Sequence, residues 1–269
     1  MGTRSLTIKI GTMIRSFSFS GEKFIGKACL SILTLLNTIT ILVGAPILLY
    51  ANIALATPAF VQGNYAVPQS PQSSVTVPYT TSQGTGDLNV VIIGWNDTTA
   101  QITSVTDTTG NVYQLAIGPT QVNGSLSQSI FYAKNIMPAS ASANAVTVTF
   151  SAAAVYPDIR VLEYSGFDPL NPVDVLVGAT GNSTTTSSGA VTTTNAMDLL
   201  VGANTVSTFT TSGGSGFTLR LDTDPDGDIA EDALVTSPGS YSATATLGSA
   251  APWVMQMVAF RCAGSVVPT

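Results

Sequence analysis

The densest group of residues that could do chemistry is an acidic run near the C-terminal end of the chain. Residues 222–232 read DTDPDGDIAED and hold six carboxylates. Carboxylates at alternating positions around a glycine turn can converge on one hard cation, as calcium-binding loops do. Calcium is therefore the one cofactor that the sequence suggests, and its predicted ligands are Asp222, Asp224, Asp226, Asp228 and Glu231.

The acidic run also departs from the helix–loop–helix calcium motif. Its twelfth position is Ala233 rather than glutamate, Pro225 restricts the backbone, and the flanking segments have the composition of strands. The alternative is a solvated hairpin loop in which the like charges repel one another into water. Both interpretations remain open at this point.

Aromatic residues beside amide and carboxylate side chains suggest a second kind of site. Sugar rings stack on exposed aromatic faces, while Asn and Asp side chains hydrogen-bond to the hydroxyl groups. Trp95 ends an apolar run and is followed at once by Asn96 and Asp97, and Tyr113 and Tyr132 could extend the same platform. The alternative for each aromatic ring is packing in the core or at its rim.

The residue inventory argues against catalysis. The chain has no histidine, which excludes Ser-His-Asp and Cys-His catalysis and imidazole metal sites. A glycosidase needs two carboxylates roughly 5–10 Å apart in a cleft, and the plausible members are Glu163, Glu231 and Asp232. We therefore expect a protein that is not an enzyme, with a carbohydrate-active hydrolase as the weaker alternative.

Charge is sparse and unevenly placed. Charged residues make up 9% of the chain, and five of the nine basic residues lie before residue 57. The remainder carries four basic and fourteen acidic residues. Such an acidic surface offers nothing to a phosphate backbone, so we expect no nucleic-acid partner.

The N-terminal segment has the features of an export signal. Residues 1–27 are cationic, residues 28–56 carry no charge, and the run ends in Ala54-Leu55-Ala56, which a signal peptidase accepts. We predict a signal peptide over 1–56 and a single domain over 57–269. The alternative is an uncleaved membrane anchor, which would be the domain's only contact with a membrane. Either outcome places the domain outside the cell or on its surface.

The rest of the chain has the pattern of an all-β fold. Short β-branched or aromatic runs such as Leu88–Trp95 recur every 10–15 residues between Gly, Asn, Asp, Pro and Ser clusters. This spacing predicts a two-sheet antiparallel β-sandwich of the jelly-roll kind. Residues 178–197 are low in complexity and could be a flexible loop or a Thr-rich edge strand. Cys262 is expected as a small apolar side chain beside the last strand, with an intermolecular disulfide as the alternative.

The two halves of this region echo one another. Asp87-Leu88-Asn89-Val90 recurs as Asp198-Leu199-Leu200-Val201, and later segments match at offsets that shrink from 111 to about 95. Shorter loops in the second half would produce that trend. An internal duplication would make a sandwich of ten or more strands, while ordinary monotony of strand sequences is the alternative.

Several segments resemble a known kind of module. The series GWNDTT, SVTDTTGNVY, SQSIFYAKNI, AVTVTF, DIRVLEYSG and DGDIAED is similar to uncharacterised β-sandwich modules of secreted bacterial proteins, which are like concanavalin A and laminin-G jelly rolls. The resemblance implies a fold and an extracellular location rather than an activity. We therefore expect a surface module that binds a glycan or another cell-surface ligand, with a self-associating structural protein as the alternative.

Overall fold

A computed structural model describes residues 4–10, 13–19 and 58–264 of the chain. The N-terminal part is a separate unit, in which β1 (Arg4–Ile10) pairs antiparallel with β2 (Met13–Phe19). The uncharged part of the predicted leader and its cleavage site lie outside the described residues. Among the residues that are described, no helix is long and apolar enough to cross a membrane.

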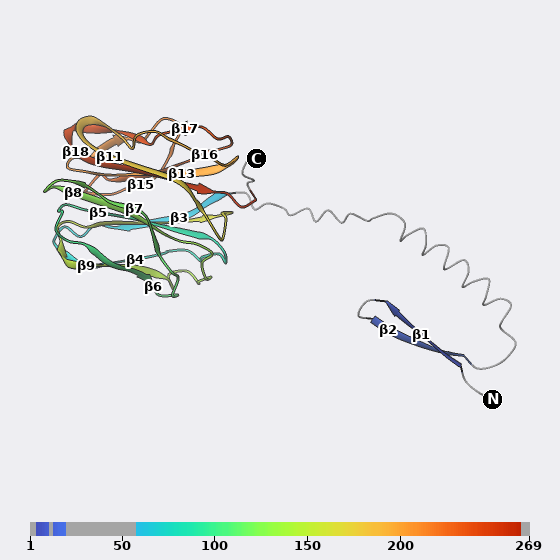
Figure 1. Ribbon diagram of the computed structural model, residues 1–269. Helices are drawn as coiled ribbons and strands as arrows, with labels where there is room; N and C mark the ends of the chain where they lie inside the picture. The colour runs from blue at the N-terminus through green and yellow to red at the C-terminus, as the bar shows by residue number, and fades with distance from the viewer. Residues whose placement is uncertain (1–3, 11–12, 20–57, 265–269) are drawn as a thin grey trace. The chain divides into compact units, whose positions relative to one another are not determined.

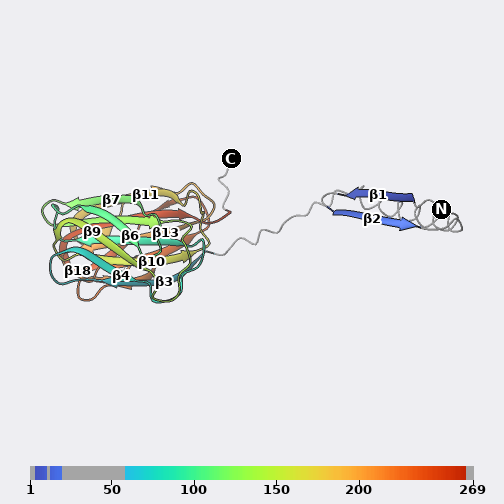
Figure 2. The same ribbon diagram turned by 90° about the horizontal axis from the view of Figure 1, so that it is seen from below.

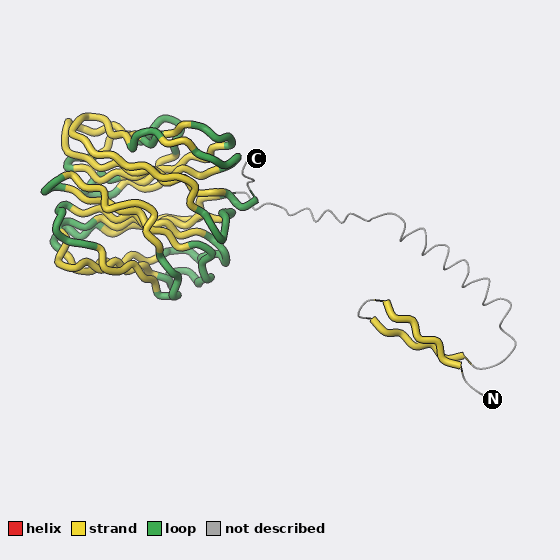
Figure 3. The backbone as a smooth tube through the Cα atoms, viewed as in Figure 1, coloured by secondary structure: helices red, strands yellow, loops and turns green. Residues whose placement is uncertain are grey.

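Residues 58–264 consist of antiparallel strands and loops, with no helix in this range (Figure 3). The all-β antiparallel sandwich expected from the strand pattern is confirmed. The expected sandwich had two sheets. The observed stack contains more, with a three-stranded, a five-stranded and a six-stranded sheet lying one on another (Figure 1).

A five-stranded sheet lies in the middle of the stack. Its strands in spatial order are β3 (Ala59–Ala66), β10 (Asp158–Ser165), β5 (Leu88–Trp95), β8 (Leu126–Ala133) and β7 (Gln114–Val122). Every residue of β5 is buried, which explains why its sequence is continuously apolar rather than alternating.

A three-stranded sheet covers one face of the five-stranded sheet. Its order is β4 (Gln72–Pro78), β9 (Ala145–Ala154) and β6 (Ile102–Asp107), and Figure 2 views the stack from the side of this sheet. Residues 145–150 of β9 alternate between partly exposed and buried, because only one face of the sheet meets the core. Trp95, Phe150 and Ile159 lie in the core between these two sheets.

A six-stranded sheet covers the opposite face of the five-stranded sheet. Its main order is β11 (Val173–Ser187), β18 (Thr244–Arg261), β13 (Asp198–Val206), β16 (Ile229–Val235) and β15 (Thr218–Asp222), and β14 (Thr210–Ser212) pairs with β18. Leu88, Ile92, Val201 and Phe260 pack in the inner core between the two sheets. Cys262 is buried in the same core, as expected for a small side chain beside the last strand.

A fourth layer lies beyond the six-stranded sheet. The pairing of β11 with β18 shifts in register between Ser183 and Thr185 of β11. Beyond this shift, the end of β11 pairs with the start of β18, and β14 pairs with the same part of β18. The pair β12 (Val191–Thr192) and β17 (Ser240–Tyr241) lies nearby (Figure 1). The core on this side contains Trp253, Met255 and Leu247. The Thr-rich segment is thus an edge strand, one of the two alternatives expected for it.

The two halves of the domain have the same topology. Replacing β3, β10, β5, β8 and β7 by β11, β18, β13, β16 and β15 reproduces the order of the six-stranded sheet, and β4–β9–β6 corresponds to the end of β11, the start of β18 and β14. We call residues 58–166 repeat one and residues 167–264 repeat two. Ile92 is equivalent to Ala203, because each lies five residues after the Asp of the Asp-Leu echo, Asp87 and Asp198.

The registers of the neighbouring strands extend this equivalence. Ile92 pairs with Arg160 and Ile130 in repeat one, and Ala203 pairs with Gln256 and Ala230 in repeat two. The offsets are therefore 111 for β5, 100 for β8 and 96 for β10, which is the shrinking trend seen in the sequence. The shared strand order supports the interpretation of the echo as an internal duplication.

The repeats face each other across an approximate two-fold axis. β7 lies over β11 and β3 lies over β15, which are equivalent pairings. The side chains agree: the ring contact between Tyr132 and Phe260 matches the contact between Asp232 and Tyr164 at equivalent positions. Because the order of strands reverses between the facing sheets, the axis runs along the strands, as in a self-complementary dimer interface.

Candidate functional site

A pocket lies where this axis leaves the stack. It has a volume of about 500 Å³ and is formed by turns at the ends of the strands, with both repeats contributing. Repeat one supplies the residues after β5, the β7–β8 turn and the β9–β10 turn, and repeat two supplies the residues after β13 and the β15–β16 turn. The lining residues are Asn96, Gly124, Ser125, Leu126, Val155, Tyr156, Val206, Ser207, Thr208, Pro225, Asp226 and Asp228.

Tyr156 provides the aromatic ring of this pocket. Its side chain is 43% exposed, and its backbone has a φ of 44°, a left-handed conformation that is unusual for a bulky residue. The turn that carries it is fastened to the end of β5: Asn96 N donates to Val155 O at 2.7 Å, and Val155 N donates to Asp97 Oδ2 at 2.9 Å. Backbone strain retained in an exposed aromatic residue is typical of functional positions.

Two carboxyl groups, Asp226 and Asp228, lie in the wall that repeat two contributes. Asp226 is partly buried and accepts a hydrogen bond from Gln69 Nε2 at 2.8 Å. Asp228 is 3% exposed and accepts one from Val206 N at 2.8 Å through Oδ1. Neither lysine nor arginine is among the residues that line the pocket. The pocket is therefore polar, acidic on one side, and open to a neutral or cationic group.

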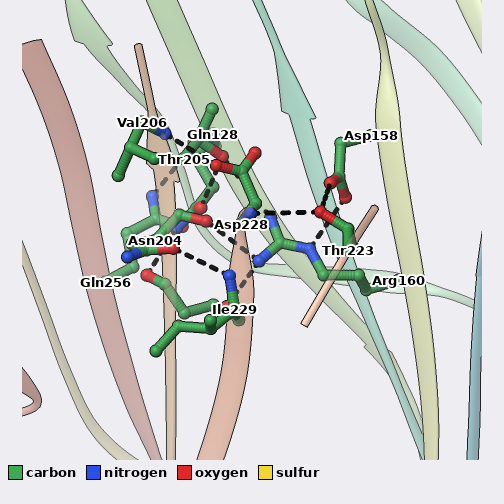
Figure 4. A network of polar contacts seen from close by, with 11 residues as sticks. Gln128, Asp158, Arg160, Asn204, Thr205, Val206, Thr223, Asp228, Ile229 and Gln256 are labelled. Carbon is green, nitrogen blue, oxygen red and sulfur yellow. Dashed lines mark hydrogen bonds and ion pairs between the residues drawn. The ribbon is translucent and has the colours of Figure 1, made fainter. Parts of the chain in front are cut away.

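A buried polar network joins the two repeats and includes the pocket residues Val206 and Asp228 (Figure 4). Arg160 is fully buried, pairs with Asp158 at 2.8 Å, and donates to Asn204 O and Ile229 O of repeat two. Thr223 Oγ1 donates to Asp158 Oδ2 at 2.9 Å and accepts from the backbone N–H of Asp228. These contacts fix the β15–β16 turn against repeat one.

The second half of the network joins two glutamines. Gln128 Nε2 donates to Gln256 Oε1 at 3.1 Å and to Ala203 O at 3.0 Å, while Thr205 Oγ1 donates to Gln128 Oε1 at 2.8 Å. Gln256 Nε2 in turn donates to Gln128 O. Each buried amide therefore has partners in the other repeat, which avoids the cost of unpaired polar groups in a core.

Burial changes the acidity of the two carboxyl groups below the pocket. Burial, followed by the charge of Asp158, raises the pKa of Asp228 well above its ordinary value, and the Arg160 guanidinium only partly offsets this. Burial also raises the pKa of Asp158, against the opposing effect of Arg160. The Arg160 guanidinium thus acts on two buried carboxyl groups and opposes the rise in the pKa of each.

The predicted aromatic platform at Trp95 is wrong. Trp95 is 1% exposed and packs edge-on against Phe150 at 5.6 Å between ring centroids. Trp95 follows Val91 and Ile93 at two-residue spacing, so all three side chains enter the core under the three-stranded sheet. The ring is closed to a sugar, although Asn96, the next residue, does line the pocket.

The other residues of that platform have separate positions. Tyr113 is partly buried, and its hydroxyl donates to Asp107 Oδ2 at 3.0 Å. Tyr132 packs against Phe260, and its hydroxyl donates to Gln114. Neither tyrosine lines the pocket. Asp97 accepts from the backbone of Thr99 and Ala100 and from Val155, so it positions the turn that carries Tyr156.

The predicted calcium ligands point in different directions. Asp222 and Asp224 are exposed, Asp226 and Asp228 line the pocket, and Glu231 lies within repeat two, where its carboxylate accepts from Gly214 N at 2.6 Å. Over the described ranges, no three His, Cys, Asp or Glu side chains are grouped so that they could hold a metal ion. Calcium binding by this loop stays a prediction.

The carboxylates of the weaker hydrolase alternative also have separate partners. Glu163 accepts from Gln62 Nε2 at 2.6 Å and from Gly84 N at 3.0 Å within repeat one. Asp232 pairs with Arg220 at 2.7 Å in repeat two. Glu163, Glu231 and Asp232 are absent from the lining of the pocket at the axis.

Tyr156 and the two-repeat origin of the pocket were missed at the sequence level. The residues AVYPD place an aromatic residue directly before a proline and after a strand, which marks it as a turn residue. The sequence therefore contained a local signal that Tyr156 lies in a turn. The position of the turn beside repeat two depends on the packing of two sheets and has no local signal.

Comparison of the chain with models of protein families, with curated proteins and with solved structures finds no match in any of the three.

Proposed function

We propose that this protein is an exported, non-catalytic module that binds a glycan in the pocket between its two repeats. The observation that carries the proposal is Tyr156, an exposed aromatic ring held over a polar pocket by a strained and well-anchored turn. Aromatic faces stack on the apolar faces of sugar rings, and amide, hydroxyl and carboxylate groups bind their hydroxyls.

The remaining lining residues suit the same class of ligand. Asn96, Ser125, Ser207 and Thr208 offer neutral donors and acceptors, and Asp226 offers a charged acceptor. An anionic ligand is disfavoured because the pocket carries carboxylates and no lining cation. A large apolar ligand is disfavoured because polar groups form most of the wall.

The position of the pocket agrees with a surface role. Asn96 follows β5 and Tyr156 precedes β10, whereas β3, the first strand of this domain, begins at Ala59, opposite Ser165 at the far end of β10. The bridge between Phe167 and Cys262 lies at that far end too. A domain held through its N-terminal segment would therefore present the pocket at the end remote from the attachment.

The test is a binding screen of the full chain on neutral oligosaccharides, followed by calorimetry with the best one. Tyr156→Asn keeps a residue that tolerates the left-handed backbone but removes the ring, and we expect binding to weaken by roughly tenfold. Tyr156→Phe retains the stacking face and should bind nearly as well as the original protein.

The matched control is Leu170→Ala. Leu170 is 69% exposed and lies in the turn after β10, at the opposite end of the sheet from the pocket. Its substitution should leave both affinity and melting temperature unchanged. Equal binding by Tyr156→Asn and the original protein would overturn the assignment of the pocket.

A further inference from the structure

We propose that the pocket selects amino sugars, whose free amine is protonated, over their neutral counterparts. This inference rests on the proposed function and names the class of glycan that the site takes. It follows from the acidic wall that repeat two contributes, and from the comparison of that wall with its equivalent in repeat one.

The fold does not require acidic residues at the wall. The equivalent connection in repeat one, between Ile117 of β7 and Ile130 of β8, has the sequence GPTQVNGSLSQS and contains no carboxyl group. Leu126 begins β8 and lines the same pocket from the other side of the axis. The two repeats join these strands through turns of different length, residues 123–125 in repeat one and 223–228 in repeat two, and of these two turns the second carries carboxyl groups.

The carboxyl groups are also under-neutralised where they lie. Asp158, Asp226 and Asp228 influence one another electrostatically, and Arg160 is the cation that acts on Asp158 and Asp228. Asp228 Oδ1 accepts from Val206 N, while Oδ2 of this nearly buried side chain has no hydrogen-bond donor among the described residues. An added positive charge in the pocket would be attracted to this wall.

An ammonium group fits this arrangement better than a metal ion does. Calcium takes six to eight oxygen ligands, and the described residues group no three carboxylates for a metal. A primary ammonium is a point charge with three donors, which the Asp226 carboxylate, an oxygen of the Asp228 carboxyl group and a neighbouring hydroxyl can satisfy. Tyr156 and the neutral side chains would then hold the sugar ring that carries the amine.

The experiment compares glucosamine oligomers with N-acetylglucosamine oligomers of the same length, by calorimetry on the full chain at a pH where the amine is protonated. We expect the free-amine oligomer to bind tighter by roughly five- to tenfold. Asp226→Asn should abolish this preference, because it weakens binding of the free-amine oligomer more than binding of the acetylated oligomer. Asp222→Asn is the matched control in the same loop, because Asp222 is exposed and does not line the pocket.

Spermidine and calcium chloride complete the set of ligands. Equal affinity for both oligomers would overturn the amino-sugar inference and leave the glycan-binding proposal standing. Binding of spermidine without binding of either oligomer would overturn both. Competition by calcium that Asp226→Asn removes would assign the wall to a metal ion and overturn the inference. Survival of the amine preference in Asp226→Asn would also overturn it.

Discussion

At the scale of single residues, the most unusual chemistry in repeat two is a glutamate inside a core. Glu231 is fully buried, and counting from the equivalent strands places it where repeat one has Phe131. Burial is the main cause that raises its pKa to about 7, against a backbone hydrogen bond from Gly214 that lowers it. The folded protein therefore keeps a proton on this group at a pH where the unfolded chain releases it.

This retained proton predicts a pH dependence of stability. Between pH 4.5 and 7 the unfolded state loses its proton first, so the free energy of unfolding falls as pH rises and levels off above pH 7. Glu231→Gln removes this contribution. We expect the stability of the variant relative to the original protein to improve by roughly 2 kcal/mol between pH 4.5 and pH 8.

Urea titrations of both proteins at several pH values measure this difference. Asp168→Asn is the control, because hydrogen bonds from the Asn171 and Leu170 backbone, offsetting partial burial, lower rather than raise the pKa of Asp168. A constant difference between Glu231→Gln and the original protein across this range would contradict the prediction.

At the scale of elements, strands β10 and β16 are joined across the repeats by Arg160. Its guanidinium is buried, pairs with Asp158 and donates to backbone carbonyls of repeat two (Figure 4). Repeat two performs the equivalent packing with Val254 in place of Asp158 and Gln256 in place of Arg160. The second repeat thus has an uncharged pair, Val254 and Gln256, at the two positions that Asp158 and Arg160 occupy in the first.

We predict that Arg160→Gln destabilises the domain by about 3 kcal/mol, because it leaves the Asp158 carboxyl buried without its cation. Adding Asp158→Val removes that orphaned charge and should restore part of the lost stability. Denaturant unfolding of the two single variants and the double variant measures the coupling. Strict additivity of the three values would contradict the ion-pair interpretation.

The elements also explain which sequence-based predictions succeeded. Strand positions and the antiparallel sandwich could be predicted, because alternation and turn residues are local signals. The orientation of Trp95 was mispredicted, although Leu88–Trp95 is continuously apolar and such runs are typical of strands covered on both faces. That signal predicted burial of the tryptophan, and it was outweighed by the polar residues that follow.

The candidate site was harder to predict from the sequence than the fold. Asn96, Asp226 and Asp228 were predicted for two different sites, and the structure brings all three to the lining of one pocket. Their convergence depends on the two-fold packing of repeats whose equivalent residues are about one hundred positions apart. The echo at Asp87 and Asp198 indicated a duplication, yet it contained no information about which faces the repeats share.

At the scale of the whole molecule, the two repeats depend on one inner core. Leu88, Ile92, Leu162, Val201 and Phe260 come from both halves and are buried together. An isolated repeat would expose this face, and large exposed apolar surfaces drive association. Residues 58–264 are therefore expected to unfold as one cooperative unit.

Calorimetry measures this cooperativity. We expect a single thermal transition for the full domain, with equal calorimetric and van't Hoff enthalpies. Residues 58–166 expressed alone should fail to give a cooperative transition as a monomer. Two separated transitions in the full domain, or a stable monomeric repeat one, would contradict the dependence on the shared core.

The placement of the pocket and the chain ends has a mechanical consequence. A load between a ligand in the pocket and the chain before Pro58 runs along β5 and β10, across which the hydrogen bonds lie perpendicular. Such a load shears many hydrogen bonds at once. A load between Pro58 and Gly264, the two ends of the described domain, acts at one end of the stack and opens the pairing of β3 and β10 one bond at a time. The domain should therefore resist force far better when it is pulled through its ligand than when it is pulled by its termini.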